Sequence, residues 1–303
     1  MLKRSITGLV IVLLCAAFIA LREVSVYFFD AFALILCYGC LIEMHLSLNL
    51  YNKKSSRIIE LIYPLIIFAI FAFIPMTLFN GKELVFVVLA LLLMFAISMV
   101  KELIVNTIKR CNGEIEKDEK VLNESLLTDT KNTISLLIYP ATLLGFFFGI
   151  NHLGLGIGYV GIILVFAVTM MTDVFAYLFG SLIRGPKMAP EISPKKSVSG
   201  MIFGFVGGIA AAGIALWLFY FEGLFASAFV SLPLWKVIVV FAIIGVFGSL
   251  LTQMGDLVAS SLKRKVGIKD FGSIFPGHGG FMDRMDGLMF NVALVYLVFV
   301  LFL

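Results

Sequence analysis

Charged side chains are scarce in this chain of 303 residues. Asp, Glu, Lys and Arg make up 14% of the sequence, whereas hydrophobic residues make up 61% and the mean hydropathy is +1.08. Such a composition excludes an ordinary water-soluble domain. The apolar stretches also lack the two-residue alternation of a membrane barrel, so backbone groups in lipid must be satisfied within helices. The sequence therefore predicts an all-α fold, a polytopic integral membrane helical bundle.

Cysteine and histidine are scarce as well, with four and three copies. Cys37 and Cys40 are separated by two residues, but they lie within a predicted helix, where cysteine behaves as a small hydrophobe. No disulfide or metal framework is therefore expected from the cysteines. His45 and His152 are expected to act as structural hydrogen-bond donors.

Nine apolar stretches are long enough to cross a membrane, since a hydrocarbon layer of roughly 30 Å needs about 20 residues of helix. The predicted spans are residues 5–21, 25–48, 58–79, 83–104, 134–151, 155–183, 200–221, 231–254 and 287–303. Residues 105–133, rich in Glu, Lys, Asp and Asn, are predicted to form a cytoplasmic loop. We expect one integrated domain of about nine helices, with four supporting spans and this loop in residues 1–133 and a catalytic region of five spans in residues 134–303.

Lysine and arginine are distributed unevenly between alternate connections. One side carries 20 of the 23, and the other keeps only Arg22, Lys82 and Lys236. Because these residues concentrate in cytoplasmic loops, the amino terminus is predicted to be cytoplasmic and the carboxyl terminus external. No small-residue cleavage site follows the first span, which is expected to be a retained helix rather than a cleaved signal peptide.

Asp173 lies inside the sixth predicted span, where an ionisable group costs a few kcal/mol unless it meets a partner, water or an ion. Tyr177 and Gly180 follow at four and seven residues and share its helical face. A carboxylate satisfied by a neighbouring helix is one interpretation. A functional carboxylate is the other, and the motifs further along the chain favour it.

The connection after the sixth span combines hydroxyl groups with adjacent cations, in Ser193, Lys195, Lys196 and Ser197. A triphosphate needs such neutralisation, but the ordinary excess of cytoplasmic charge would also place lysines here. In the seventh span, Gly200, Gly204 and Gly208 form a bare stripe. This stripe predicts close helix packing, against the eighth span or another subunit.

Three carboxylates gather around the last connection. Asp283 and Asp286 are three residues apart and would project from one face of a helix, and Asp256 lies at the cytoplasmic end of the eighth span. Magnesium takes oxygen ligands and keeps positions for water and substrate phosphates, so two or three aspartates suffice. The alternative is an Asp-Arg-x-Asp ion-pair pattern on a solvated helix.

A glycine-rich turn surrounds the third histidine, in the order Gly277, His278, Gly279 and Gly280. Glycine permits backbone conformations that other residues avoid, and successive amide groups in such turns can hold an anion. His278 is then positioned to hydrogen-bond a phosphate or to support a metal ligand.

The order and spacing of these motifs resemble the phosphatidate cytidylyltransferase family, also called CDP-diacylglycerol synthases. The matching elements are Ser193-Pro194-Lys195-Lys196, Gly255-Asp256-Leu257, Lys263-Arg264, Lys269-Asp270 and Pro276 through Asp286, with Asp173, Ala176, Tyr177 and Gly180 upstream. The resemblance covers about residues 170–290. Ser199 and Ala259 depart from it, since acidic residues are usual at both positions in the family.

The resemblance implies that CTP and phosphatidic acid react to give CDP-diacylglycerol and pyrophosphate, with magnesium as cofactor and room for a second metal ion. It implies metal binding by Asp256, Asp283 and Asp286, with Asp173 as a further ligand or a supporting group. It also implies that the phosphates are bound by Lys195, Lys196, Lys263, Arg264, Arg284 and the His278 turn. The remaining residues of the implied substrate site are Ser193, Ser197, Tyr177 and Lys269. We expect Asp283→Asn to abolish turnover and to leave the protein folded.

Other functions fit parts of the pattern. A lipid kinase or an isoprenoid-lipid cytidylyltransferase would use the same devices for phosphate and metal, and an ion transporter would explain Asp173 and Asp256 alone. The expected location is the inner membrane, with the site facing the cytoplasm and the bilayer as partner. A homodimer is expected from the resemblance and the glycine stripe. No nucleic-acid partner is expected, since the basic residues lack interleaved aromatic side chains.

Overall fold

The protein is described by a computed structural model, in which residues 2–50, 55–73, 83–111, 119–183, 185–222, 229 and 232–302 are placed. The elements are α1 Leu2–Leu21, α2 Val26–Leu50, α3 Arg57–Phe73, α5 Glu83–Cys111, α6 Glu119–Leu136, η1 Leu137–Thr142, α7 Leu143–His152, α8 Leu155–Ile183, β1 Lys187–Ala189, β2 Ser193–Ser197, α9 Val198–Leu216, η2 Trp217–Phe221, α10 Leu234–Val266, α11 Met282–Met285 and α12 Leu288–Phe302. Each predicted span overlaps helical residues. Residues 74–79 of the third span, and Lys82, lie outside the described residues.

The helices have the length and composition of membrane spans. Within the described residues, six helical segments are long and apolar enough to cross a membrane, and Ile6–Leu21 and Leu288–Phe302 are shorter apolar helices. The predicted fold class, a helical multi-pass membrane protein, is confirmed.

Two boundaries differ from the prediction because polar residues continue a helix. α10 runs on from the predicted end at residue 254 to Val266 and ends at Gly267, whose φ of 73° is left-handed. The last turn carries Lys263, Arg264 and Lys265, which favour a helix carboxyl end. Residues 105–111 and 119–133, predicted as loop, are helical parts of α5 and α6. Their Lys, Glu and Leu residues are good helix formers.

The chain forms two compact units. Unit 1 comprises Met1–Ala33 and Phe146–Leu303, and unit 2 comprises Leu34–Gly145. The compact units therefore divide the chain differently from the two predicted regions, because α1 belongs with the carboxyl-terminal helices.

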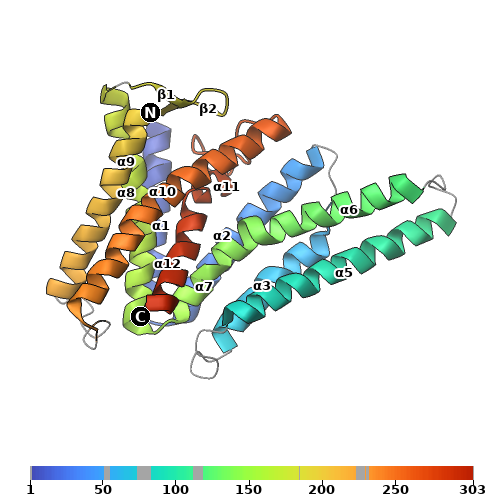
Figure 1. Cartoon of the computed structure of the whole chain (residues 1–303), viewed down its shortest axis with the longest axis horizontal. Coiled ribbons are helices and arrows are strands. Elements are labelled where there is room, and N and C mark those ends of the chain that lie inside the picture. Colours follow the sequence, from blue (N-terminus) through green and yellow to red (C-terminus); the bar gives the residue numbers. More distant parts are fainter. Residues whose placement is uncertain are drawn as a thin grey trace. The chain divides into compact units, whose positions relative to one another are not determined.

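In unit 1, α8, α9, α10 and α12 pack against one another (Figure 1). The glycine stripe of α9 makes this packing close. A methyl group at Gly204 would lie 3.0 Å from the carbonyl oxygen of Thr172 in α8, and one at Gly208 would overlap Ser249 of α10. The predicted contact with the eighth span is therefore present, α8 is an additional partner, and the stripe is used within the chain.

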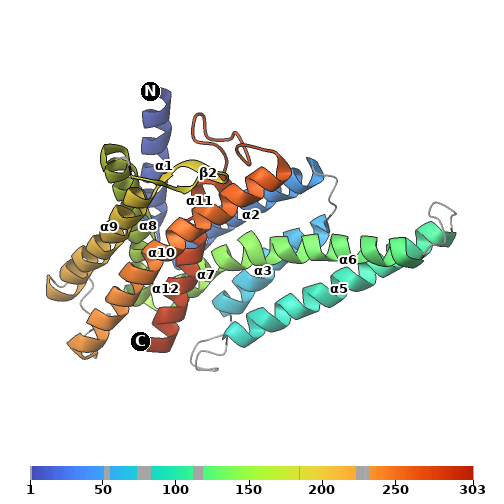
Figure 2. The same cartoon turned by 45° about the horizontal axis from the view of Figure 1, so that its top comes forward.

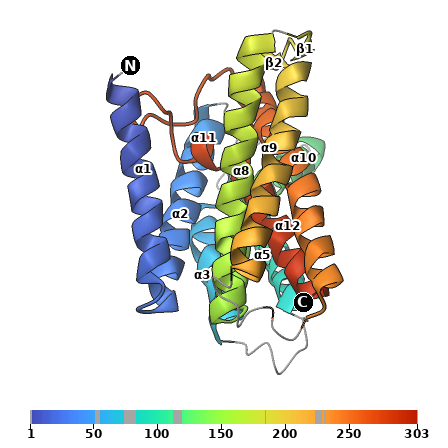
Figure 3. The ribbon, with the colours of Figure 1, turned by 90° about the vertical axis from the view of Figure 1, so that its left-hand side faces the viewer.

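The connections of unit 1 meet at one end of these helices. The antiparallel β1–β2 hairpin lies beside α10 (Figure 2), and Arg264 Nε in the last turn of α10 donates to the Ile192 carbonyl at 3.4 Å. The amino-terminal end of α1 reaches the segment between α10 and α11 (Figure 3), and Thr7 Oγ1 donates to the Pro276 carbonyl at 3.2 Å. The amino terminus and this segment therefore share one end of unit 1.

Unit 2 is built on α3, α5, α6 and η1. Its core includes Tyr63, whose hydroxyl lies 2.8 Å from Thr142 Oγ1. Cys37 and Cys40 are buried free thiols. His45 contacts Glu60 in unit 2, and His152 contacts Asp30 in unit 1, so each of these histidines meets a buried carboxylate.

Candidate functional site

Two aspartates meet where α10 and α12 come together. Gly255 of α10 lies against the backbone of Asp286 and Gly287, and Gly287 in turn faces the carbonyl of Thr252, which is 2.9 Å from the position a Cβ would take. Only residues without a side chain allow two backbones to approach this closely. The contact places the neighbouring Asp256 and Asp286 at the same end of unit 1, as the expected pairing of the eighth and ninth spans requires.

This contact predicts a large effect for a single methyl group. Gly255→Ala is expected to destabilise the protein by about 1–3 kcal/mol through overpacking. It should also lower activity by about a hundredfold, because a shift of the two aspartates disturbs the site. Thermal unfolding and turnover of the purified protein measure both effects.

Gly213→Ala is the matched control, because nothing lies within 4 Å of a Cβ at that position of α9. Its unfolding temperature should be unchanged or slightly higher, since Ala favours a helix more than Gly. Equal behaviour of the two variants would contradict the close approach at Gly255.

Lysine and arginine side chains from three elements interact with the aspartates at this end of unit 1. Lys196 of β2 forms an ion pair with Asp256 at 2.5 Å, and its Nζ also donates to the Gln253 carbonyl at 3.4 Å. The charge of Lys263 of α10 acts on Asp286, and the charge of Arg284 of α11 acts on Asp173 of α8. Phosphate binding by these cations stays a prediction.

Asp286 is held in an environment that disfavours its negative charge. Burial, and next the charge of Asp256, raise the pKa of the Asp286 carboxyl to about 8, although Lys263 opposes the shift. Asp173 of α8 also interacts electrostatically with both Asp256 and Asp286. A cation bound between these side chains would relieve their mutual repulsion.

Asp283 has partners of its own. Its side chain is buried, with 3% exposed, and Oδ1 accepts from Lys263 Nζ at 2.9 Å. Oδ2 accepts from the backbone N–H groups of Phe271, at 2.9 Å, and Gly280, at 3.0 Å. Three donors therefore occupy this carboxylate, and it ties the α10–α11 segment to the end of α10.

The predicted glycine turn is formed, with φ of 78° at Gly277 and 82° at Gly279. The His278 backbone N–H donates to the Phe275 carbonyl at 2.8 Å, and the buried Nδ1 has no partner among the described residues. A methyl group at Gly279 would lie 2.7 Å from Asp283 Oδ2. The Gly280 amide serves Asp283 here, and phosphate binding by this turn stays a prediction.

The other predicted residues lie at varying positions. Ser197 is buried and caps α9 by accepting from the Gly200 N–H at 3.1 Å, and Ser193 pairs with Ala189 in the hairpin. Tyr177 is 76% exposed, and Lys269 is exposed without an ion pair among the described residues. Lys195 belongs to β2, but its side chain is outside the described part. The structure therefore assembles part of the predicted substrate site.

Gln253 is a residue that sequence reasoning missed. It is buried in α10, one turn before Asp256, and its Nε2 donates to the Met201 carbonyl of α9 at 3.2 Å. Because its own carbonyl accepts from Lys196, Gln253 joins the hairpin to both helices. The sequence signal that could have indicated Gln253 is a single amide side chain in an apolar helix, three residues before an aspartate.

A metal could bind two carboxylates at this site, each of which keeps one oxygen. Lys196 pairs with Oδ2 of Asp256, and the Gly287 N–H donates to Oδ1 of Asp286. Within the described residues, no group of three or more His, Cys, Asp or Glu side chains is arranged to hold a metal. Magnesium is often bound through one or two carboxylates, with water and substrate phosphates completing its shell. Asp256 and Asp286 fit this pattern, whereas Asp283 is already occupied.

Comparison with known proteins places the chain in a family. The family model described as the cytidylyltransferase family matches residues 2–302. The chain is 41% identical over 141 residues to a phosphatidate cytidylyltransferase of Brucella abortus biovar 1 (strain 9-941), covering 46% of this chain and 47% of the relative. It is 37% identical over 139 residues to one of Staphylococcus haemolyticus (strain JCSC1435), covering 46% and 48%. It is 36% identical over 158 residues to one of Staphylococcus aureus (strain COL), covering 52% and 55%.

These matches span about half the length of the curated relatives. The family model, in contrast, extends over nearly the whole chain. The protein therefore belongs to the cytidylyltransferase family.

Proposed function

We propose that this protein is a phosphatidate cytidylyltransferase, which converts CTP and phosphatidic acid to CDP-diacylglycerol and pyrophosphate. The observation that carries this proposal is a cluster at one end of unit 1, in which Asp173, Asp256 and Asp286 interact electrostatically with one another and with Lys196, Lys263 and Arg284. Such a cluster suits two polyanionic substrates and a divalent cation. The names of the curated relatives support the same activity.

The reaction needs charge neutralisation more than proton transfer. An oxygen of the lipid phosphate attacks the α-phosphorus of CTP, a new P–O bond forms, and the bond to the bridging oxygen breaks with release of pyrophosphate. The attacking phosphate is already ionised at neutral pH, so a general base is not required. Lys196, Lys263 and Arg284 would hold the two anions together and stabilise charge on the leaving group.

Asp256 and Asp286 would hold magnesium, which when bound supplies positive charge to the leaving pyrophosphate. Binding a cation would favour the ionised form of Asp286, whose pKa is raised by burial and by the charge of Asp256. The ion pair between Lys196 and Asp256 gives Lys196 a second role, since nucleotide phosphates would compete for this lysine.

The proposed orientation places the site at the cytoplasmic face of the inner membrane. Two observations support it: most lysines and arginines belong to the connections on that predicted side, and the amino-terminal end of α1 lies beside the α10–α11 segment. The amino terminus and the site would then face the compartment that contains CTP. A homodimer remains part of the proposal on the family resemblance alone, because the glycine stripe packs within the chain.

The proposed reaction is tested with purified protein in liposomes that contain phosphatidic acid. With CTP labelled in the cytosine and magnesium present, we expect label in a lipid product, release of pyrophosphate, and loss of both when a chelator is added. With CTP labelled on the γ-phosphate, no lipid label is expected. Lipid label from the γ-phosphate would instead identify a kinase, and ion flux without turnover would identify a transporter.

A further inference from the structure

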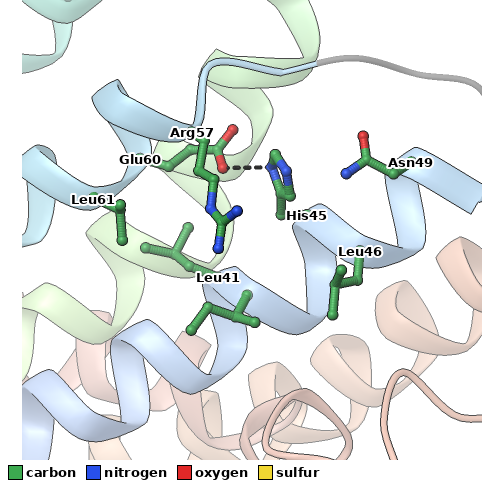
Figure 4. Close-up of a pocket in the computed structure, with 8 residues that line it drawn as sticks. Leu41, His45, Leu46, Asn49, Arg57, Glu60 and Leu61 are labelled. Carbon is green, nitrogen blue, oxygen red and sulfur yellow. Dashed lines mark ion pairs between the residues drawn. The ribbon is translucent and has the colours of Figure 1, made fainter.

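A small cavity lies in unit 2 where α2 and α3 approach each other. Its volume is about 140 Å³, and it is lined by Leu41, Ile42, His45, Leu46 and Asn49 of α2 and by Arg57, Glu60 and Leu61 of α3. Figure 4 shows polar side chains from both helices gathered at one side of leucine residues. The cavity plays no part in the site of unit 1 described above.

At this cavity the buried Glu60 contacts His45, which is partly exposed. The Glu60 side chain is 5% exposed, and its Oε2 lies 2.8 Å from His45 Nδ1. Ser55 Oγ lies 2.9 Å from the same ring nitrogen. These contacts fix the imidazole and engage its Nδ1. They also direct the Glu60 carboxylate to His45 instead of Arg57.

The Arg57 guanidinium consequently has no carboxylate partner among the described residues. In Figure 4 it extends from the start of α3 toward the same space as His45, and the Asn49 amide faces that space from α2. Arg57 is exposed, so an anion can reach its guanidinium. Arg57 and Asn49 supply N–H donors of the kind that an anionic oxygen cluster requires.

The surroundings and size of the cavity narrow the choice of anion. Ile42, Leu46 and Leu61 at the cavity are 48%, 56% and 44% exposed, and in a membrane these side chains meet acyl chains. Pockets for drug-sized ligands measure roughly 300–1,000 Å³. The cavity is smaller, so it suits a compact group such as a phosphate and excludes a nucleotide. An anion presented among acyl chains is a lipid headgroup.

We propose that this cavity, formed by His45, Asn49 and Arg57 above Leu41, Leu46 and Leu61, binds the phosphate headgroup of an anionic membrane phospholipid. The lipid phosphate would pair with the guanidinium of Arg57, and its acyl chains would lie along the apolar side chains of α2 and α3. The site is additional to the proposed catalytic site, and binding there does not depend on turnover.

Phosphatidylglycerol is a suitable probe, because it is anionic and is not a substrate of the proposed reaction. Binding to the full chain in detergent is followed by native mass spectrometry. Arg57→Gln is expected to weaken phosphatidylglycerol binding about tenfold, since a charge-assisted hydrogen bond is lost. Arg57→Lys should bind with intermediate affinity, because it keeps the charge and loses the planar fork. Asn49→Ala tests the same site without altering charge, should Arg57→Gln fail to fold.

Lys131→Gln is the matched control, since it removes one exposed cation from unit 2 outside the cavity and should leave binding unchanged. Phosphatidylcholine should bind more weakly than phosphatidylglycerol. Equal loss in Arg57→Gln and Lys131→Gln would show general charge attraction and overturn the proposal. Inorganic phosphate that displaces no lipid, but binds with an Arg57-dependent affinity, would identify a soluble-anion site and also overturn it.

Discussion

Asp286→Asn is expected to lower cytidylyl transfer at least about a hundredfold, because it removes one of the two carboxylates available to a divalent cation. The protein should remain folded. Burial and Asp256 already disfavour the negative charge of Asp286, so a neutral amide of the same shape relieves repulsion in the metal-free protein. Its unfolding temperature without magnesium should therefore equal or exceed that of the parent. Turnover and thermal unfolding, each with and without magnesium, measure these effects.

Glu222→Gln is the matched control for Asp286→Asn. Glu222 is an exposed carboxylate that directly follows η2. Because η2 continues α9, Glu222 lies at the opposite end of this helical segment from Ser197. Its loss should change neither turnover nor the effect of magnesium on stability. Full activity of Asp286→Asn would show that Asp286 is not part of the catalytic site. If magnesium still raised the unfolding temperature of Asp286→Asn, the metal would bind elsewhere.

The helices were predictable from the sequence because hydropathy alone determines which segments can lie in lipid. The spans in residues 155–183 and 200–221 coincide closely with α8 and with α9 and η2. Hydropathy does not show where a helix ends in water. It therefore missed the polar extension of α10 to Val266 and the helical parts of residues 105–133.

The position of Asp256 beside Asp286 was also accessible to sequence reasoning, since it follows from pairing the last two spans. The glycines that make this approach possible were not assigned to it beforehand. Gly255 and Gly287 act through backbone contacts with Asp286 and Thr252, which leave no hydrophobic pattern in the sequence. The stripe of α9, in contrast, showed itself through a regular four-residue spacing.

The roles of Asp283 and Asp286 could not be separated by spacing. Residues three apart share a helical face, yet α11 contains only Met282–Met285. Asp283 meets Lys263 and two backbone N–H groups, whereas Asp286 interacts with Asp256. Which backbone N–H groups donate, here those of Phe271 and Gly280, depends on how the segment folds. The residue types in the sequence therefore do not predict these hydrogen bonds.

These contacts change the expectation for Asp283→Asn, which we now expect to destabilise the protein as well as to lose activity. Breaking a buried ion pair by removing one partner costs about 3–5 kcal/mol, because the other charge stays buried. Lys263 is that partner, with 12% of its side chain exposed. The amide group of Asn also brings donors toward the N–H groups of Phe271 and Gly280. Thermal unfolding of Asp283→Asn should therefore occur well below that of the parent.

Asp270→Asn is the stability control, since Asp270 is exposed in the same segment and has no ion pair among the described residues. A double-mutant cycle with Lys263→Gln isolates the pair itself. If the ion pair holds the segment, the double variant is less destabilised than the sum of the two single variants. Additive effects would contradict that coupling.

Asp283→Asn with lost turnover and an unchanged unfolding temperature would instead favour direct metal binding, as the spacing of the aspartates first indicated. A segment held by Asp283 positions Arg284 and Asp286 for catalysis, so stability and activity should fall together in variants that break this carboxylate's contacts.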